Sequence, residues 1–213
     1  MSNDPLIDRL ARDLKPVRRR TAGRDAALLG LLCLVELALF LGLGAMRPDM
    51  PVAMEQPSFW WKLGSVGLIA SVGAAVAVVS FDPVRSPRRG LRWLAAIIAL
   101  CLAAGWIVDA SGDGWPALAT RVNWHEGMQC AAKIVALSVP LMLGLGLLMR
   151  HGAPTDSGGA ALASGIAAAA WGAFVFVFAC PYDDPLYIAV WYAVGCGIVT
   201  VIARLALPRL TRW

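Results

Sequence analysis

The sequence contains few charged residues and no closely spaced pair of cysteines. Asp, Glu, Lys and Arg make up 15% of its 213 residues, whereas 59% are hydrophobic. A soluble domain of this length has too little interior to bury so many apolar side chains. The five cysteines form no CxxC pair and match no zinc spacing. No small-residue cleavage site follows a short apolar stretch near Met1, so no cleavable signal peptide is expected.

Six apolar stretches, separated by turn-forming residues, dominate the sequence. Each is about 20 residues long, which is the length that an α-helix needs to cross the hydrocarbon core of a bilayer. Proline, glycine and aspartate between them indicate water-exposed connections. We therefore predict an all-α membrane protein whose six transmembrane helices form a bundle. The expected spans are residues 26–46, 59–80, 91–110, 128–149, 159–179 and 186–207.

The distribution of positive charge predicts the orientation of these spans. An even number of spans places both termini on the same side. With the N-terminus inside, 15 of the 19 Lys and Arg residues lie on the inner side, and the outer side holds Arg47, Lys62, Arg121 and Lys133. Because basic residues concentrate in cytoplasmic loops, we expect a bacterial inner-membrane protein with both termini in the cytoplasm. The net charge of +5 then reflects orientation and not direct binding of nucleic acid.

Residues 1–24 form a cytoplasmic segment that precedes the expected membrane domain, residues 25–213. Asp4 and Pro5 are typical of a helix start, because Asp accepts hydrogen bonds at the N-cap and Pro needs no partner at the first position. The residues that follow place an apolar stripe on one helix face. The stripe consists of Leu6, Ile7, Leu10, Leu14 and Val17.

A helix of about 13 residues is marginally stable alone in water, so this stripe is expected to cover a partner surface. One partner is the lipid headgroup layer, attracted by Arg18 to Arg20 and by Arg24. The other is a groove on a cytoplasmic protein. Asp8 and Asp13 weigh against the lipid, because anionic headgroups repel them.

The predicted topology distinguishes two cysteines from the other three. Cys130 lies at the outer mouth of the fourth span and Cys180 at the outer end of the fifth, so a hairpin of these spans brings them to similar depth. Cys33, Cys101 and Cys196 lie deeper and are expected to pack as small apolar residues.

The sequence leaves three roles open for the outer pair. The two cysteines can form a disulfide in the periplasm, bind a divalent metal ion, or pack without further function. Additional candidate ligands lie on nearby turns: His125, Glu126, Asp183 and Asp184. A separate candidate is Glu36 in the middle of the first span, where a carboxylate is costly and is expected to have a partner inside the bundle.

Four blocks of sequence together resemble one known family. They are residues 6–19, residues 127–130 with 137–140, residues 150–155, and residues 180–186 with 190–192. In this order, and with six spans, they resemble the NrsF family of membrane-bound anti-sigma factors. That family negatively regulates sigma-F-type extracytoplasmic-function sigma factors in bacteria.

The resemblance implies a partner and a signal. It implies that the N-terminal segment sequesters the sigma factor through its apolar stripe, with register set by Asp8, Arg9, Arg12 and Asp13. It also implies that Cys130 and Cys180 sense heavy-metal or related stress and trigger release. No obligatory cofactor is expected, and the only metal is a regulatory divalent ion at the two cysteines.

The chain departs from the family at one position. Members often have His directly before the first cysteine, where this sequence has Gln129. If that His is a ligand, His125 has to substitute for it, one helical turn earlier. The competing interpretations are a membrane thiol-disulfide oxidoreductase, which needs more outer cysteines, and a small transporter coupled through Glu36. We expect the protein not to be an enzyme.

Overall fold

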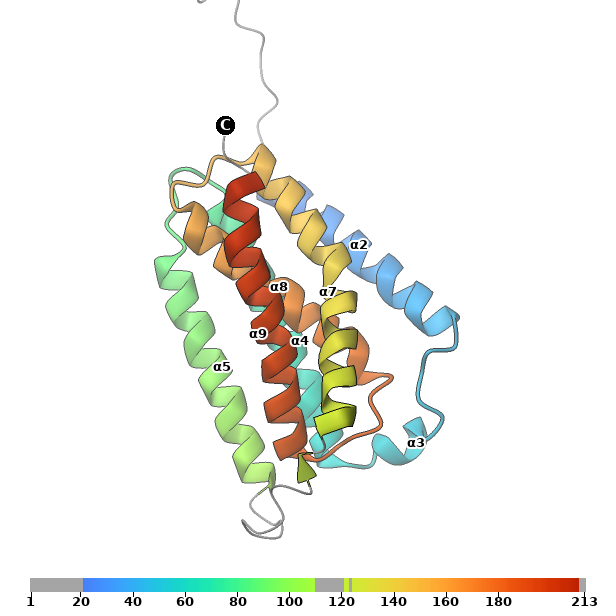
Figure 1. The fold of residues 1–213 in the computed structure, drawn as a ribbon. Coiled ribbons are helices and arrows are strands. Elements are labelled where there is room, and N and C mark those ends of the chain that lie inside the picture. Colours follow the sequence, from blue (N-terminus) through green and yellow to red (C-terminus); the bar gives the residue numbers. More distant parts are fainter. Residues whose placement is uncertain (1–20, 110–120, 123, 211–213) are drawn as a thin grey trace, which may run out of the picture.

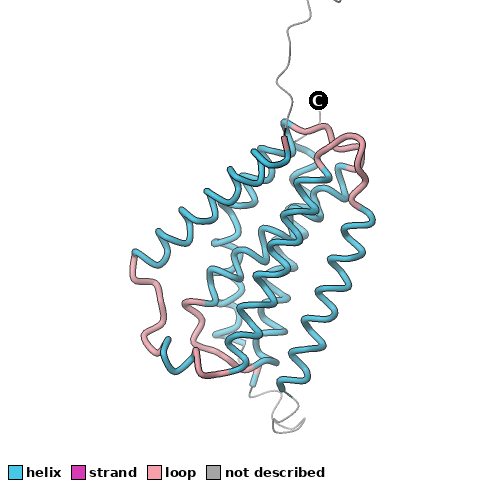
Figure 2. Tube along the Cα trace, turned by 180° about the vertical axis from the view of Figure 1, so that it is seen from behind, coloured by secondary structure: helices cyan, strands magenta, loops and turns pink. Residues whose placement is uncertain are grey.

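The computed structural model describes residues 21–109, 121–122 and 124–210, and helices joined by loops and turns make up this part of the chain (Figures 1 and 2). Its helices are α2 (Ala22–Gly42), α3 (Met50–Ala53), α4 (Pro57–Ser80), α5 (Arg88–Asp109), α7 (Trp124–His151), α8 (Ser157–Val177) and α9 (Pro185–Leu210). Apart from the four-residue α3, each is long and apolar enough to cross a membrane. The predicted all-α class and its six long apolar helices are therefore confirmed.

The helix ends follow from local chemistry. Pro57 begins α4, where its missing N–H costs nothing, and the Asp156 carboxylate caps α8 by accepting from the Gly159 N–H at 2.8 Å. The first long helix ends at Gly42, earlier than the predicted residue 46. Just beyond it, Gly44 adopts φ +72°, a left-handed conformation that turns the chain and that glycine tolerates best.

Helix α8 lies at the centre of the molecule and packs against α4, α7 and α9. Most of its side chains are buried, and most of these are alanine or glycine. Such small residues let neighbouring helices approach closely. At Gly172, a Cβ atom would lie only 2.7 Å from the Ile134 carbonyl oxygen of α7. The core is therefore built by close backbone approach around one helix.

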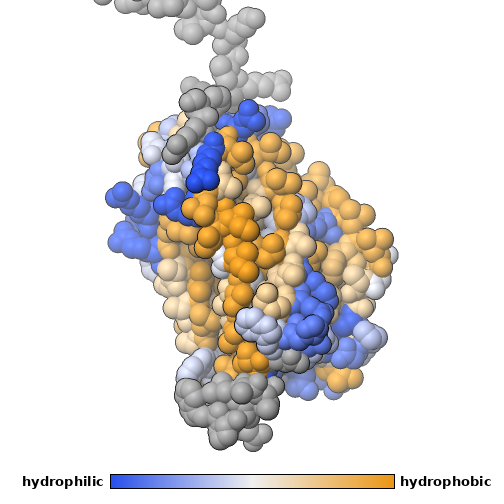
Figure 3. All heavy atoms as spheres, in the orientation of Figure 1, coloured by the Kyte–Doolittle hydropathy of each residue, from blue (hydrophilic) through white to orange (hydrophobic). Residues whose placement is uncertain are grey.

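Helices α2 and α5 lie at the periphery. Helix α2 buries only Asp25 and Leu29 and runs obliquely to its neighbours (Figure 1). Its remaining leucines are largely exposed, among them Leu31 and Leu34. Apolar side chains cover much of the visible surface, and hydrophilic ones gather mainly toward its two ends (Figure 3).

The start of α2 and the end of α9 lie at the same end of the molecule (Figure 1). This agrees with an even number of crossings. The residues of the predicted N-terminal contact with a partner lie outside the described part of the chain. They are Leu6, Ile7, Asp8, Arg9, Leu10, Arg12, Asp13, Leu14 and Val17.

Candidate functional site

The structure brings Cys130 and Cys180 together at the end of the molecule opposite the start of α2. Cys130 lies near the start of α7, and Cys180 lies in the loop between α8 and α9. Their thiols interact with each other, both cysteines are free, and their exposed fractions are 4% and 0%. The hairpin of α7 and α8 thus places two residues, 50 positions apart in the sequence, in direct contact.

Tyrosines surround the thiol pair. The Tyr187 hydroxyl lies 3.3 Å from Cys130 Sγ, and the rings of Tyr182 and Tyr187 contact each other at a tilt, with centroids 4.5 Å apart. In its thiol form Cys180 donates to the Tyr182 carbonyl oxygen at 3.6 Å. The Tyr192 hydroxyl lies beside the Cys180 sulfur but outside hydrogen-bonding geometry. The pair is therefore enclosed by aromatic rings and screened from water.

The two thiols are not equivalent. The interaction with the neighbouring Cys130 thiol lowers the pKa of Cys180 from 9.0 to about 6. Burial acts in the opposite direction, and the positive charge of Lys62 lowers this pKa further. A thiolate is the form that attacks oxidants and binds metal ions. The surroundings of Cys180, with the Cys130 thiol and the Lys62 charge nearby, thus favour its thiolate form.

The candidate metal ligands of the sequence are engaged elsewhere. His125 Nε2 lies 3.3 Å from Gln129 Nε2, and the Glu126 carboxylate contacts the Tyr182 hydroxyl. Asp184 accepts from Arg121 Nε at 2.7 Å; burial opposes its ionisation, but Arg121 keeps the pKa of Asp184 below its ordinary value. Across the described ranges, no group of three or more His, Cys, Asp or Glu side chains is arranged to hold a metal ion.

Asp183 takes part in a buried ion-pair cluster beside the thiols. Its carboxylate accepts from Lys62 Nζ at 2.8 Å and from Arg47 Nη1 at 2.7 Å. Arg47 also pairs with Asp49 at 2.6 Å, which lowers the pKa of Asp49 to about 2. Lys62 is 1% exposed. Arg47 and Lys62, which the sequence placed among the outer charges, are therefore buried parts of the site. Their burial was not predicted.

Arg47 also contacts the loop that carries Cys180. Its Nη1 donates to the Cys180 carbonyl oxygen at 2.8 Å, and its backbone N–H donates to the Phe178 carbonyl oxygen at 2.9 Å. Arg47 thus holds this loop on both sides of Cys180.

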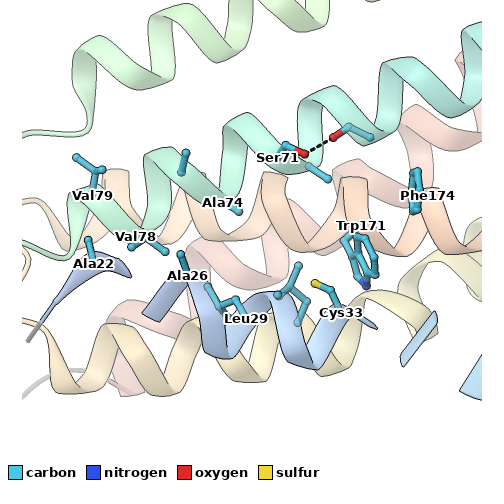
Figure 4. A pocket seen from close by; sticks show the side chains of 15 residues that line it. Ala22, Ala26, Leu29, Cys33, Ser71, Ala74, Val78, Val79, Trp171 and Phe174 are labelled. Atoms are coloured by element: carbon cyan, nitrogen blue, oxygen red, sulfur yellow. Dashed lines mark hydrogen bonds between the residues drawn. The ribbon is translucent and has the colours of Figure 1, made fainter. Parts of the chain in front are cut away.

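Glu36 has the internal partner that the sequence could not identify. Its Oε2 accepts from Trp171 Nε1 of α8 at 2.9 Å. Beside it lies a cleft of about 500 Å³, lined by α2, α4 and α8 residues that include Cys33, Ala74 and Phe174 (Figure 4). Cys33 and Cys196 are half-buried against the core, and Cys101 accepts from Trp61 Nε1 through its carbonyl oxygen. None of these three approaches the thiol pair as a ligand group.

Fold and site together define an all-helical protein with six potential membrane spans and a buried, polarised dithiol. The chain belongs to the NrsF family: the family profile described as "Negative regulator of sigma F" matches residues 10–213. The resemblance predicted from the four sequence blocks is confirmed.

Two relatives match over their whole length. The chain is 31% identical over 215 residues to "Anti-sigma-F factor NrsF" of Caulobacter vibrioides (strain NA1000 / CB15N), with 100% of both chains covered. It is 29% identical over 217 residues to "Probable anti-sigma-F factor NrsF" of Azospira oryzae, again with 100% of both chains covered. No solved structure matches the chain.

Proposed function

We propose that this protein is an anti-sigma factor of the bacterial inner membrane, which holds an extracytoplasmic-function sigma factor through residues 1–24. Membership of the NrsF family across residues 10–213 carries this proposal. The full-length match to a relative named an anti-sigma-F factor supports it. The role is regulatory and not catalytic, and it involves no direct contact with nucleic acid.

Residues 25–213 form the membrane-embedded sensor in this proposal, and both termini lie in the cytoplasm. Six long apolar helices support the membrane location, and the excess of Lys and Arg on one side supports the orientation. Lipid then contacts the exposed leucines of α2. The thiol pair faces the periplasmic end, where an external stress reaches it first.

The sensing element in this proposal is the pair Cys130 and Cys180. Their contact as free thiols supports a resting dithiol state. A two-electron oxidant such as a peroxide or a diazene converts the pair to a disulfide, taking up two electrons and two protons. A soft ion such as Cd²⁺ is bound by the two cysteines as thiolates, after their thiols have released their protons. Either product must favour the sigma-free state, because equal affinity for both states shifts nothing.

Purification of the full-length protein from its native membranes tests the class of function. A co-eluting sigma factor is the expected result. A co-eluting quinone without a sigma factor would instead indicate a thiol oxidoreductase. Neither partner, together with uptake of a solute into vesicles, would indicate a transporter.

Substitutions in the N-terminal segment test the site of sigma binding. Truncated interface anchors typically cost about 2 kcal/mol or more, so Leu10→Ala or Leu14→Ala should activate a sigma-dependent promoter without stress. Val84→Ala is a matched control, because Val84 is an exposed apolar residue in an inner loop. Full repression by a protein that lacks residues 1–20, with membrane insertion verified, would contradict the assignment.

A further inference from the structure

Arg47 connects the thiol pair to the first long helix. It lies a few residues beyond Gly42, the end of α2. The Leu43 and Gly44 N–H groups still donate to the Leu39 and Leu41 carbonyl oxygens, so only residues 45 and 46 separate the hydrogen-bonded end of α2 from Arg47. At about 3.3–3.6 Å per residue, such a short link has little slack.

Arg47 also forms hydrogen bonds with three residues between α8 and α9. The backbone N–H reaches Phe178 O, and the guanidinium reaches both Cys180 O and the Asp183 carboxylate, all within 2.9 Å. These points bracket Cys180. A displacement of Cys180 therefore moves the atoms to which Arg47 is bound.

Helix α2 itself is weakly held by packing. It buries two side chains, and the cleft of about 500 Å³ separates part of it from α4 (Figure 4). One polar contact of α2 with the core is the hydrogen bond from Trp171 to Glu36 at 2.9 Å. An element with few buried contacts moves at low free-energy cost, and α2 leads directly into residues 1–20.

We propose that the contacts of Arg47 with Cys180 and Asp183 transmit the state of the thiol pair to α2 and, through it, to the N-terminal segment. Arg47 is thus a positioning residue of the sensor. This proposal rests on the proposed function for its output and not for its mechanical step. Disulfide formation draws the Cys180 and Cys130 sulfurs to about 2.05 Å, and the loop carries Arg47 with it.

The test uses Arg47→Met, which removes the guanidinium but keeps an unbranched apolar chain. Lys62→Met is the comparison variant, because Lys62 is also buried and pairs with the same Asp183 but belongs to α4. Since the charge of Lys62 also lowers the pKa of Cys180, exchange of α2 is compared in all proteins after disulfide formation is complete. Full-length protein in lipid nanodiscs is treated with diamide, which accepts two electrons and two protons to become the hydrazine. Disulfide formation is measured by mass spectrometry, and motion of α2 by hydrogen exchange of residues 22–42.

In the wild type and in Lys62→Met, disulfide formation should change the exchange rate of α2. In Arg47→Met the disulfide should form while exchange of α2 stays unchanged, and induction of the sigma-dependent promoter by diamide should fall at least about fivefold. Arg47→Lys should retain part of the response, since the Lys ammonium can pair with Asp183 but lacks the several N–H donors of the guanidinium.

Three results for Arg47→Met would overturn the proposal. They are a change in α2 exchange on oxidation as large as in the wild type, loss of disulfide formation, or full promoter activity without oxidant. The last would make Arg47 a restraint on the resting state and not a transmitter. If α2 responds as described but no sigma factor is bound, the coupling stands and the proposed function fails. If a sigma factor is bound but α2 of the wild type does not respond to disulfide formation, the proposed function stands and the coupling through Arg47 fails.

Discussion

The guanidinium of Arg47 donates to the carbonyl oxygen of Cys180 at 2.8 Å, across 133 positions of sequence. Both residues are buried, and the contact joins the end of the first long helix to the loop after the fifth. Cys180 is thus fixed from two directions, by Cys130 through its sulfur and by Arg47 through its backbone.

Substitution of the outer cysteines should separate sensing from repression. Cys130→Ser or Cys180→Ser should repress as the wild type does but no longer respond to cadmium or diamide, because neither a disulfide nor a two-thiolate site can form. Cys33→Ser, Cys101→Ser and Cys196→Ser should respond normally, since those residues lie apart from the pair. A sigma-dependent reporter measures both properties. A normal cadmium response in the Cys130→Ser, Cys180→Ser double variant would refute the sensor role.

The reactivity of Cys180 should depend on pH in the acid range. Since the pKa of Cys180 is lowered to about 6, the thiolate is present above that pH and is lost as the pH falls through it. Modification by methyl methanethiosulfonate, followed at the Cys180 peptide, should have its midpoint there. Cys130→Ala removes the main cause, so the midpoint should move toward 9.0. Identical midpoints in the two proteins would show that Cys130 does not set the acidity.

Gly172 should be the most sensitive of the glycines on the α7–α8 contact. An added Cβ would lie 2.3 Å from Ser138 Oγ and 2.7 Å from Ile134 O, so Gly172→Ala forces α7 and α8 apart. Overpacking of this kind costs about 1–3 kcal/mol. Gly64→Ala is the control, because nothing lies within 4 Å of its added Cβ. Thermal unfolding in detergent should show a lower Tm for Gly172→Ala than for Gly64→Ala; equal Tm values would contradict the packing.

Glu36 should act through its hydrogen bond with Trp171 and not through a negative charge. Glu36→Gln keeps an acceptor for Trp171 Nε1 and is expected to preserve stability and response. Glu36→Leu leaves that N–H without an acceptor, which costs about 1–3 kcal/mol when the donor is buried. Thermal unfolding and tryptophan fluorescence distinguish the two variants. A response lost in Glu36→Gln would instead indicate that the carboxylate is needed as an ion.

The orientation makes an independent prediction. A reporter that is active only in the periplasm should be active when fused after Gly112 or after Asp184, and silent when fused after Pro87 or Trp213. The physical basis is the placement of 15 of the 19 basic residues on the opposite side. The reverse pattern of activity would place Cys130 and Cys180 in the cytoplasm and remove their role as external sensors.

Apolar length predicted the six long helices, because a stretch of about 20 apolar residues has few alternatives to a helix. The first helix was predicted to end at residue 46, because the apolar stretch continues through Leu43 to Met46. In the structure the backbone turns at Gly44. The hairpin argument placed Cys130 and Cys180 at similar depth, and the structure brings them into contact.

The ion pairs were beyond reach from the sequence. Arg47 and Lys62 were counted as charges on the outer side because hydropathy treats a buried, paired cation and a solvated one alike. Their partner Asp183 was considered as a metal ligand because the sequence does not show that its carboxylate is already paired with these two cations. Pairing across distant segments depends on packing, and spacing along the chain does not encode it.

Helix α8 is surrounded by protein on nearly every side. When a cell alters the thickness of its bilayer, lipid-facing helices respond by tilting, and α2 and α5 have the exposed surface to do so. In the proposed membrane location, α8 would have little contact with lipid through which to be tilted. Because Cys180 follows directly on α8, its height relative to Cys130 on the adjoining α7 is set by protein packing. In the proposed membrane location, a change in bilayer thickness would then reach the Cys180 loop chiefly through α2 and Arg47, the same contacts that are proposed to carry the signal outward.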